Sequence, residues 1–521
     1  MSIGLRWDFR AATSEALNHF FWLDVKNANG GLCYADPKLT NSVVAPGGDA
    51  NSGPILRYCG SVPHPGSKTP FAPRLGINYR LTDKMVLRGG YGIFYDSYEG
   101  REIDDSADIY PYSVRNSLNP TSDPTVPKLS NQMFPDHTAL VPFPASTLSF
   151  IAVIESENPL NPYVQSWTAS VEREIARNTT LEVNYIGTHA VHLLDRHDIA
   201  QPYALAASDQ AFCQHKDATG NYDNLSVSPC APRVANASGQ YPRMQYKNFT
   251  NFYINSDFHG YSHYNALNVK FEHRAGDLAV TSVYTWANSK DDKSAAAGVG
   301  ASGTGYQGFM DNHNTKLDYG PSDFDVDQRF VASYIYNLPI GRGKKIAGTA
   351  NRAADLAIGG WEVTGITTFQ KGFPYSVSSS DIGGVQATVA PRPNLVSGCN
   401  PTGNLTAKFQ RLNMSCFSQQ LPGTFGNTTR NFLRQPGINN WDMGFAKNFH
   451  FAEWMNFKLS VDTFNTFNHH QYGGDVGGLA AGGSGGNAAI DSSVNSPAST
   501  AGKITSSSSA RVLQLGGKLT F

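Results

Sequence analysis

The residues that could carry out catalysis form no complete catalytic motif in this sequence. The pattern GxSxG occurs once, at Gly482–Gly486. A nucleophilic serine in this pattern needs a strand, a sharp turn and a helix around it, whereas Ser484 lies in a stretch rich in glycine, serine and alanine. HExxH and GxxxxGK(S/T), common zinc-protease and nucleotide-binding motifs, are absent. We therefore expect no enzyme and no cofactor.

Grouped histidines and aspartates could in principle bind cations. The histidines are His189, His192, His197, His259, His263, His469 and His470. The aspartates are Asp291, Asp292, Asp318, Asp323, Asp325 and Asp327. Imidazoles could hold a transition metal and carboxylates Ca²⁺, but the EF-hand spacing is absent. We favour ordinary polar loop histidines and solvated loop carboxylates, and predict no metal site.

The elements that must position any site follow a period of two. In 511–521, leucines and Phe521 occupy alternate positions, and mainly polar residues lie between them. Such alternation predicts a strand with one apolar and one polar face. Clear cases are 73–81, 166–173, 180–186, 264–273, 278–287, 455–462 and 511–521, and weaker ones are 2–9, 85–95, 329–338, 361–370 and 441–449. This makes about twelve antiparallel strands, each long enough to cross a bilayer when tilted.

The connections between these strands alternate between short and long. Short polar turns include 82–84, 176–178, 275–277 and 450–454, and a longer one, 339–360, could hold a helix around Asn351–Ala357. The long segments are 10–70, 96–163, 188–263, 288–327, 371–439 and 468–510. Short turns on one side and long loops on the other are typical of an outer-membrane barrel with extracellular loops. With the short turns periplasmic, both chain ends lie on the periplasmic side.

Aromatic and charged residues fit the same architecture. Aromatic residues near strand ends would form interfacial girdles; they are Tyr95, Trp167, Tyr185, Trp286, Trp361, Trp441 and Trp454. Charged residues on the polar faces would line the lumen; they are Arg74, Arg80, Arg88, Glu172, Glu182, Lys270, Glu272, Glu362, Asp442, Lys458, Asp462 and Lys518. The alternative is a soluble sandwich or propeller, which would have short loops at both ends.

Composition excludes several other classes of protein. Charged residues make up 16% and aromatic residues 12% of the 521 residues, and 50 are glycines. The net charge of −1 provides no basic field for nucleic acid. No window is apolar enough for a transmembrane helix, and the first residues do not resemble a secretory signal. Apolar residues at alternate positions, interfacial aromatics and glycine-rich loops together account for this composition.

The six cysteines give an independent test of the loop assignment. Cys33 and Cys59, Cys213 and Cys230, and Cys399 and Cys416 fall two per loop, in three of the long loops. Intraloop disulfides are the simplest interpretation, and they imply an oxidising compartment. The alternative is reduced cysteines in a cytosolic protein. No CxxC motif is present, so a zinc site of that type is not supported.

Several short segments along the chain carry a family resemblance. They are FAPRLGINYRLTDK at 71–84, LRGGYGIFYD at 87–96, NPYVQSW at 161–167, ERE at 172–174, YNAL at 264–267, YTWANSKDD at 284–292, SDFDVDQRFV at 322–331, GGW at 359–361, NNWD at 439–442 and FNTFNH at 464–469. Together they resemble the barrel of Oar-like TonB-dependent receptors, a family typical of acidobacteria and related Gram-negative bacteria. The terminal Leu519-Thr-Phe521 resembles the signal that the barrel assembly machinery recognises. Each segment is weak alone, and the combination is specific.

The resemblance implies an outer-membrane receptor that imports a ligand, such as an oligosaccharide or peptide, with energy from TonB. Receptors of this kind have a signal peptide, a carboxypeptidase-regulatory-like domain and a plug before a barrel of about 22 strands. We find none of these in residues 1–521 and expect the C-terminal part of such a barrel, embedded in outer-membrane lipid. A smaller barrel closed by 2–9 and 511–521, a non-transporting adhesion or structural barrel, and a secreted carbohydrate-binding β-protein are the alternatives.

Overall fold

The structure is a computed structural model of the 521-residue chain. It describes residues 1–8, 18, 21–24, 26, 32–35, 37, 56–60, 70–96, 152–154, 160–199, 201–232, 234, 236–238, 242–246, 253–294, 309–382, 384–385, 391–403, 405, 409–452, 455–472, 493–497, 499–505, 507–508 and 510–521. Within these ranges, no helix is both long enough and apolar enough to cross a membrane.

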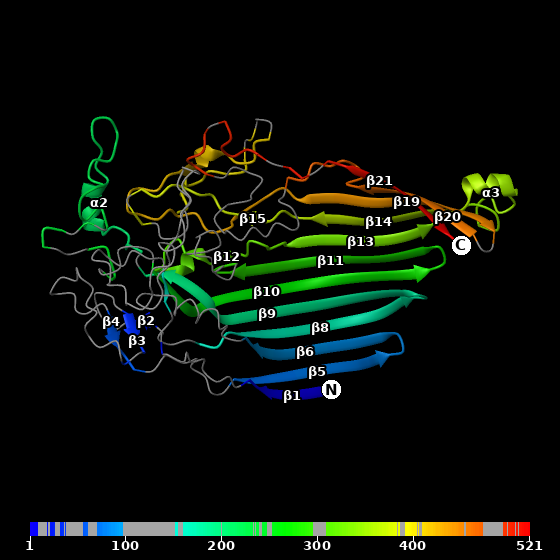
Figure 1. The fold of residues 1–521 in the computed structure, drawn as a ribbon, viewed down its shortest axis with the longest axis horizontal. Helices are drawn as coiled ribbons and strands as arrows, with labels where there is room; N and C mark the ends of the chain where they lie inside the picture. The colour runs from blue at the N-terminus through cyan, green and yellow to red at the C-terminus, as the bar shows by residue number, and fades with distance from the viewer. Residues whose placement is uncertain are drawn as a thin grey trace, which may run out of the picture.

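One large antiparallel sheet dominates the fold, and twelve strands follow one another along it (Figure 1). They are β1 (Ser2–Trp7), β5 (Phe71–Thr82), β6 (Met85–Tyr95), β8 (Tyr163–Ala176), β9 (Thr179–Asp198), β10 (Tyr253–Ala275), β11 (Leu278–Asp291), β13 (Gln328–Asn337), β14 (Trp361–Gln370), β19 (Ile438–Ala452), β20 (Met455–Phe464) and β21 (Val512–Thr520). β7 (Ala152–Ile154) and β12 (Gly320–Pro321) pair at its side. The predicted antiparallel architecture is confirmed.

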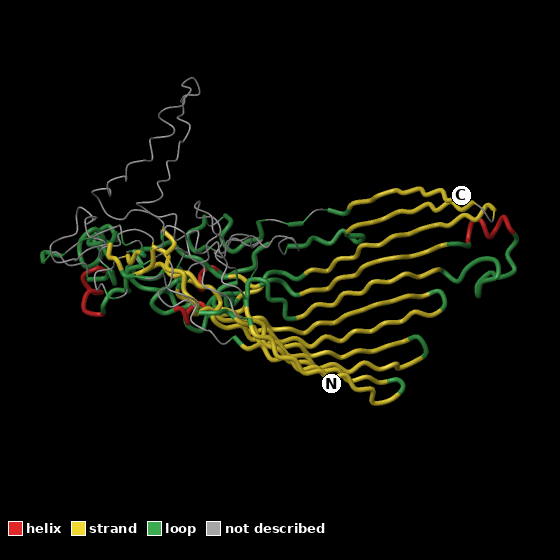
Figure 2. Tube along the Cα trace, turned by 60° about the horizontal axis from the view of Figure 1, so that its bottom comes forward, coloured by secondary structure: helices red, strands yellow, loops and turns green. Residues whose placement is uncertain are grey.

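The sheet is curved and open (Figure 2). In the part of the chain that the structure describes, β1 pairs only with β5 and β21 pairs only with β20. These two strands therefore form the free edges of the sheet. Every neighbouring pair along the twelve-strand path is joined in sequence order, which is the up-and-down connectivity of a barrel wall.

Two strands are much longer than their alternating segments predicted. β9 has 20 residues and β10 has 23, and their pairing continues to Asp198 and Ile254. The predicted loop 188–263 is therefore wrong at both ends, and His189, His192, His197, His259 and His263 lie in strands. Backbone pairing does not require apolar side chains, so a strand can continue in water after its alternation stops.

Backbone register separates the side chains of the sheet into two faces. Directly paired residues lie on the same face. One row runs through Val171, Val183, Val269, Tyr284 and Phe330 across five strands; we call this the apolar face. The opposite face, which we call the charged face, carries a row through Arg80, Val86, Glu172, Glu182 and Lys270.

Tight hairpins join the strands at one end of the sheet. Asn178 and Gly276 have φ values of +58° and +59°, the left-handed conformation that two-residue hairpin turns use. The longer connection between β13 and β14 contains α3 (Arg352–Ile358), which confirms the helix predicted there. The side chain of Asn351 caps it by accepting a hydrogen bond of 2.8 Å from the backbone N–H of Ala354.

The segments at the other end of the sheet contain small elements rather than plain loops. They are β2 (Phe21–Leu23), β3 (Leu32–Tyr34), β4 (Leu56–Tyr58), α2 (Ala207–Cys213), η1 (Thr315–Asp318), β15 (Pro374–Tyr375), β16 (Asn394–Leu395), η2 (Met414–Cys416), β17 (Phe417–Ser418) and β18 (Leu433–Arg434). Val377, Leu412 and Leu433 form part of a buried apolar cluster there. These segments are thus folded around cores of their own.

Candidate functional site

All twelve charged residues predicted to line a lumen share the charged face. Its ion pairs join Arg88 to Glu172 at 2.5 Å and Lys270 to Glu272 at 3.0 Å. Lys458 pairs with Glu362 at 2.7 Å. Charges of both signs therefore neutralise one another along this wall. The arrangement offers hydrogen-bonding groups to a polar solute without a strong net attraction for either sign.

A groove of about 710 Å³ lies across the sheet, with most of its polar lining on the charged face. Arg274 lies on one side of it and Asp442 and Asp462 on the other. Ile335 and Ile366 supply apolar lining and are about half exposed. Opposite charges beside apolar side chains can bind an amphipathic solute. The sequence analysis identified both aspartates but missed Arg274, which follows the alternating segment 264–273.

The apolar face is exposed along its length, as a lipid-facing surface requires. Leu75, Ile77, Val183, Trp286 and Leu459 are each exposed by 38% or more. A soluble sheet would cover such a face with another layer. Contiguous exposed apolar surface of this kind marks contact with a membrane or another protein.

The predicted position of the aromatic residues is only partly correct. Tyr95 and Trp361 lie at strand ends. Trp167, Tyr185 and Trp286 lie inside strands, because β8, β9 and β11 continue beyond the apolar segment. Trp441 lies near the beginning of β19, and Trp454 lies outside the described residues.

Arginines and aspartates form a cluster at the end of the sheet that carries the long segments. Arg430 pairs with Asp291 at 2.7 Å and with Asp323 at 3.0 Å. It also donates hydrogen bonds to the backbone oxygens of Asp291 and Asp318. We call Asp291, Asp318, Asp323, Asp325, Asp327, Arg392, Arg430 and Arg434 the arginine–aspartate cluster.

The cluster ties segment 391–434 to the ends of β11 and β13. Arg392 pairs with Asp318 at 2.5 Å, with both side chains buried. Arg434 pairs with the buried Asp325, whose carboxylate also accepts a hydrogen bond of 2.6 Å from Ser289 N–H. The prediction of solvated loop carboxylates is therefore wrong for Asp291, Asp292, Asp318 and Asp325, all of which are buried. Their partners lie far away in the sequence, which is why their spacing carried no signal.

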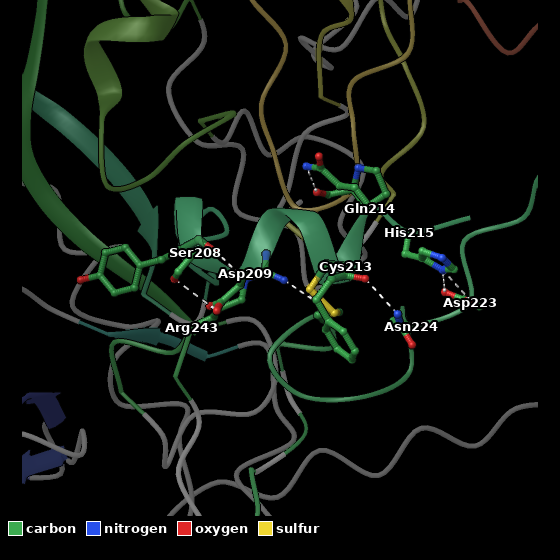
Figure 3. Close-up of a disulfide and its surroundings, with 12 residues drawn as sticks. Ser208, Asp209, Cys213, Gln214, His215, Asp223, Asn224 and Arg243 are labelled. Carbon is green, nitrogen blue, oxygen red and sulfur yellow. Dashed lines mark hydrogen bonds and ion pairs between the residues drawn. A yellow bond between two sulfur atoms is a disulfide. The ribbon is translucent and has the colours of Figure 1, made fainter. Parts of the chain in front are cut away.

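Three disulfides join the six cysteines. They link Cys33 to Cys59, Cys213 to Cys230, and Cys399 to Cys416. These are the pairs that two cysteines per loop suggested. Figure 3 shows the Cys213 bridge at the end of α2, where Asn224 donates a hydrogen bond of 2.9 Å to Phe212 O.

Arg243 connects this disulfide loop to its neighbours. Its guanidinium donates hydrogen bonds of 2.8 Å to Tyr203 O and 2.7 Å to Cys230 O. Burial lowers the pKa of Arg243 to about 10. It nevertheless remains a cation at neutral pH, and backbone oxygens solvate it in place of water.

One group of potential metal ligands occurs in the described residues: Asp24, Cys33 and Cys59. Both cysteines are oxidised in a disulfide, so they cannot provide the thiolates that a metal needs. The GxSxG segment 482–486 lies outside the described residues.

Fold and surface together define the class: a curved β-sheet wall with one exposed apolar face and one charged face, as membrane barrels have. The family described as outer membrane beta barrel domain matches residues 1–514. The chain belongs to this family, which places it in the outer membrane. A search of curated proteins finds no match.

Several solved structures are similar to this chain at low identity. The outer membrane transporter YddB from Escherichia coli matches with 9% identity and a TM-score of 0.40, over 87% of this chain and 41% of YddB. The ferric enterobactin receptor PfeA of Pseudomonas aeruginosa matches with 10% identity and a TM-score of 0.36, over 86% and 40%. The ferric citrate transporter FecA matches with 10% identity and a TM-score of 0.32, over 77% and 34%. This chain spans about two fifths of YddB and PfeA.

Proposed function

We propose that the chain is the C-terminal wall of an Oar-like, TonB-dependent receptor barrel that takes up a ligand through a polar lumen. The observation that carries this proposal is the division of one long sheet into an exposed apolar face and a charged face. A wall between lipid and water needs that division. The segments with similarity to Oar-like receptors support the subfamily.

In this proposal the charged face lines the lumen. The groove between Arg274 and Asp462 offers a passing solute a polar site on this wall. A peptide or an oligosaccharide fits its chemistry, since charges of both signs beside Ile335 and Ile366 can contact both polar and apolar groups.

We propose two protein partners, one for assembly of the barrel and one for its energy supply. Phe521 is 90% exposed directly after β21, and we assign it as the residue that the barrel assembly machinery binds. We assign coupling to TonB to an N-terminal plug domain, which would fill the lumen beside the charged face.

Uptake can be tested in the source bacterium without knowing the ligand. Wild-type cells, cells lacking this gene and cells lacking TonB would be grown on a mixture of peptides and oligosaccharides. Mass spectrometry of the medium would follow which compounds disappear. We expect one set of compounds to persist in both deletion strains, and complementation with the intact gene to restore its uptake.

A matched variant links uptake to the wall. Arg274→Ala removes the cation of the groove, whereas Arg177→Ala changes an exposed residue of the turn between β8 and β9. We expect slower uptake only with Arg274→Ala, at equal amounts of protein in the outer membrane. Identical depletion of the medium by all strains would reject transport, and loss of surface attachment instead would favour the adhesion alternative.

A further inference from the structure

The connection between β13 and β14 is longer than a hairpin requires. At this end of the sheet, two residues suffice between β5 and β6, β8 and β9, and β10 and β11, but here the chain runs from Leu338 to Gly360. This turn is internally bonded: Ile346 N–H donates to Pro339 O at 2.9 Å, and Arg342 N–H donates to the Asp355 carboxylate at 2.6 Å. Closing the hairpin does not explain why this connection is both long and ordered, so we looked at what it contacts.

The C-terminal end of α3 packs against the apolar face of the sheet. Trp361 and Lys447 are paired residues on that face. The indole N–H of Trp361 donates to Ala357 O at 3.2 Å, and the Lys447 ammonium donates to Gly359 O. Gly360 has φ +69°, and a Cβ there would lie 2.4 Å from Asn448 O. A side chain at position 360 would therefore push the helix away from the sheet.

The outward side of this turn is apolar. Ile346 is 56% exposed, Leu356 40% and Trp361 39%. Ala353 and Ala357, which flank Leu356 on α3, are exposed as well. A surface helix in water turns its polar side outward, so α3 has the opposite arrangement. Such a surface is stable where hydrocarbon replaces water.

The same turn is strongly basic. Residues 338–360 contain Arg342, Lys344, Lys345 and Arg352, and Asp355 is their single acidic residue. All four basic side chains are exposed, and Lys344 pairs with Asp277 of the neighbouring hairpin at 2.9 Å. Basic residues beside apolar and aromatic ones are typical of segments that lie in the headgroup region of an anionic membrane.

We propose that residues 338–361 form a membrane-interface anchor that binds anionic phospholipid. Leu356 and Ile346 enter the acyl-chain region, and the basic side chains contact headgroup phosphates at the hairpin end of the barrel. The site is continuous with the exposed apolar face, which already requires lipid. Its placement at the inner leaflet rests on the proposed orientation of the barrel.

Depth in the membrane provides the first test. Because no described cysteine is free, Leu356→Cys introduces a unique site for a nitroxide label. The full chain would be placed in vesicles of phosphatidylethanolamine and phosphatidylglycerol. Paramagnetic resonance would compare collisions with oxygen, which enters lipid, and with a water-soluble nickel complex. We expect a label at Leu356 to collide mainly with oxygen, and one at the exposed Thr349 mainly with nickel.

A label at Leu459, on the apolar face of β20, separates this proposal from the barrel itself. If the label at Leu459 collides mainly with oxygen and the label at Leu356 mainly with nickel, the proposed anchor is wrong, but the membrane barrel is supported. If both report water, the outer-membrane barrel also fails for this chain.

Lipid selectivity provides the second test. Native mass spectrometry of the full chain would count bound phosphatidylglycerol in the wild type and in the double variant Arg342→Ser, Lys345→Ser. We expect fewer bound phosphatidylglycerol molecules in the double variant and no loss with Lys216→Ser, at the other end of the molecule. Equal counts in all three proteins would overturn the assignment of the basic side chains to lipid phosphate.

Discussion

Arg430 satisfies two carboxylates at once, and one of them, Asp291, is only 2% exposed. Arg430→Met leaves this buried charge without its partner. Removing one member of a buried ion pair costs about 3–5 kcal/mol. We expect the free energy of unfolding of the long segments to fall by that amount. Urea titration followed by limited proteolysis in detergent micelles would measure it.

Lys371→Met is the matched control for Arg430→Met. Lys371 pairs with Asp327 at 3.2 Å, but half of its side chain is exposed. An exposed ion pair contributes roughly 0–1 kcal/mol, so this substitution should have little effect. Equal losses in the two variants would show that burial of the arginine–aspartate cluster is not what stabilises the segments.

Asp311 makes the same region sensitive to pH. Burial raises its pKa above the ordinary value of 3.8, although a hydrogen bond from His313 N–H opposes the shift. A carboxyl group with a raised pKa stabilises the fold below its unfolded pKa, and this contribution is lost as pH rises through the folded pKa. In the wild type, stability should therefore fall as pH rises above the ordinary carboxyl pKa of 3.8, and Asp311→Asn should abolish this loss. Urea unfolding midpoints measured across the acid pH range would test this. If Asp311→Asn loses stability with rising pH as the wild type does, another group is responsible.

Between neighbouring strands, a glycine gives space to a large aromatic ring. Gly187 of β9 pairs with Trp167 of β8, and a Cβ at Gly187 would lie 2.3 Å from the indole. Gly187→Ala must move the ring or separate the strands, and overpacking of this kind costs about 1–3 kcal/mol. Gly4→Ala is the control, since nothing lies within 4 Å of its Cβ. Unfolding in micelles, followed by tryptophan fluorescence, should distinguish the two variants, and equal stabilities would contradict this packing argument.

The strands were predictable because alternation is a local property. Each of the twelve expected segments overlaps a strand of the main sheet, and α3 lies where its turn was expected. The ends of β9 and β10 were not predictable, because backbone pairing continues there without an apolar pattern. The arginine–aspartate cluster was hidden for another reason: Arg430 and Asp291 lie 139 residues apart. Only the folded chain brings their charges together.

At the scale of the whole molecule, the free edges of β1 and β21 constrain the structure that this sheet can adopt in a membrane. Ile3 and Leu515 are each more than 75% exposed on the apolar face of these edge strands. Unpaired backbone groups in hydrocarbon cost several kcal/mol each. Each edge therefore has to pair, either with further strands of a longer barrel or with the other edge.

Cross-linking distinguishes these two arrangements. If the wall belongs to a longer barrel, Ile3→Cys and Leu515→Cys in one chain are separated by the remaining strands and form no intramolecular disulfide in the outer membrane. Leu459→Cys with Gly517→Cys is the positive control, because these residues are directly paired between β20 and β21. Mass spectrometry of non-reduced digests would detect either link. A bond between positions 3 and 515 as efficient as the control would mean that β1 and β21 pair directly, closing a small barrel of this chain alone.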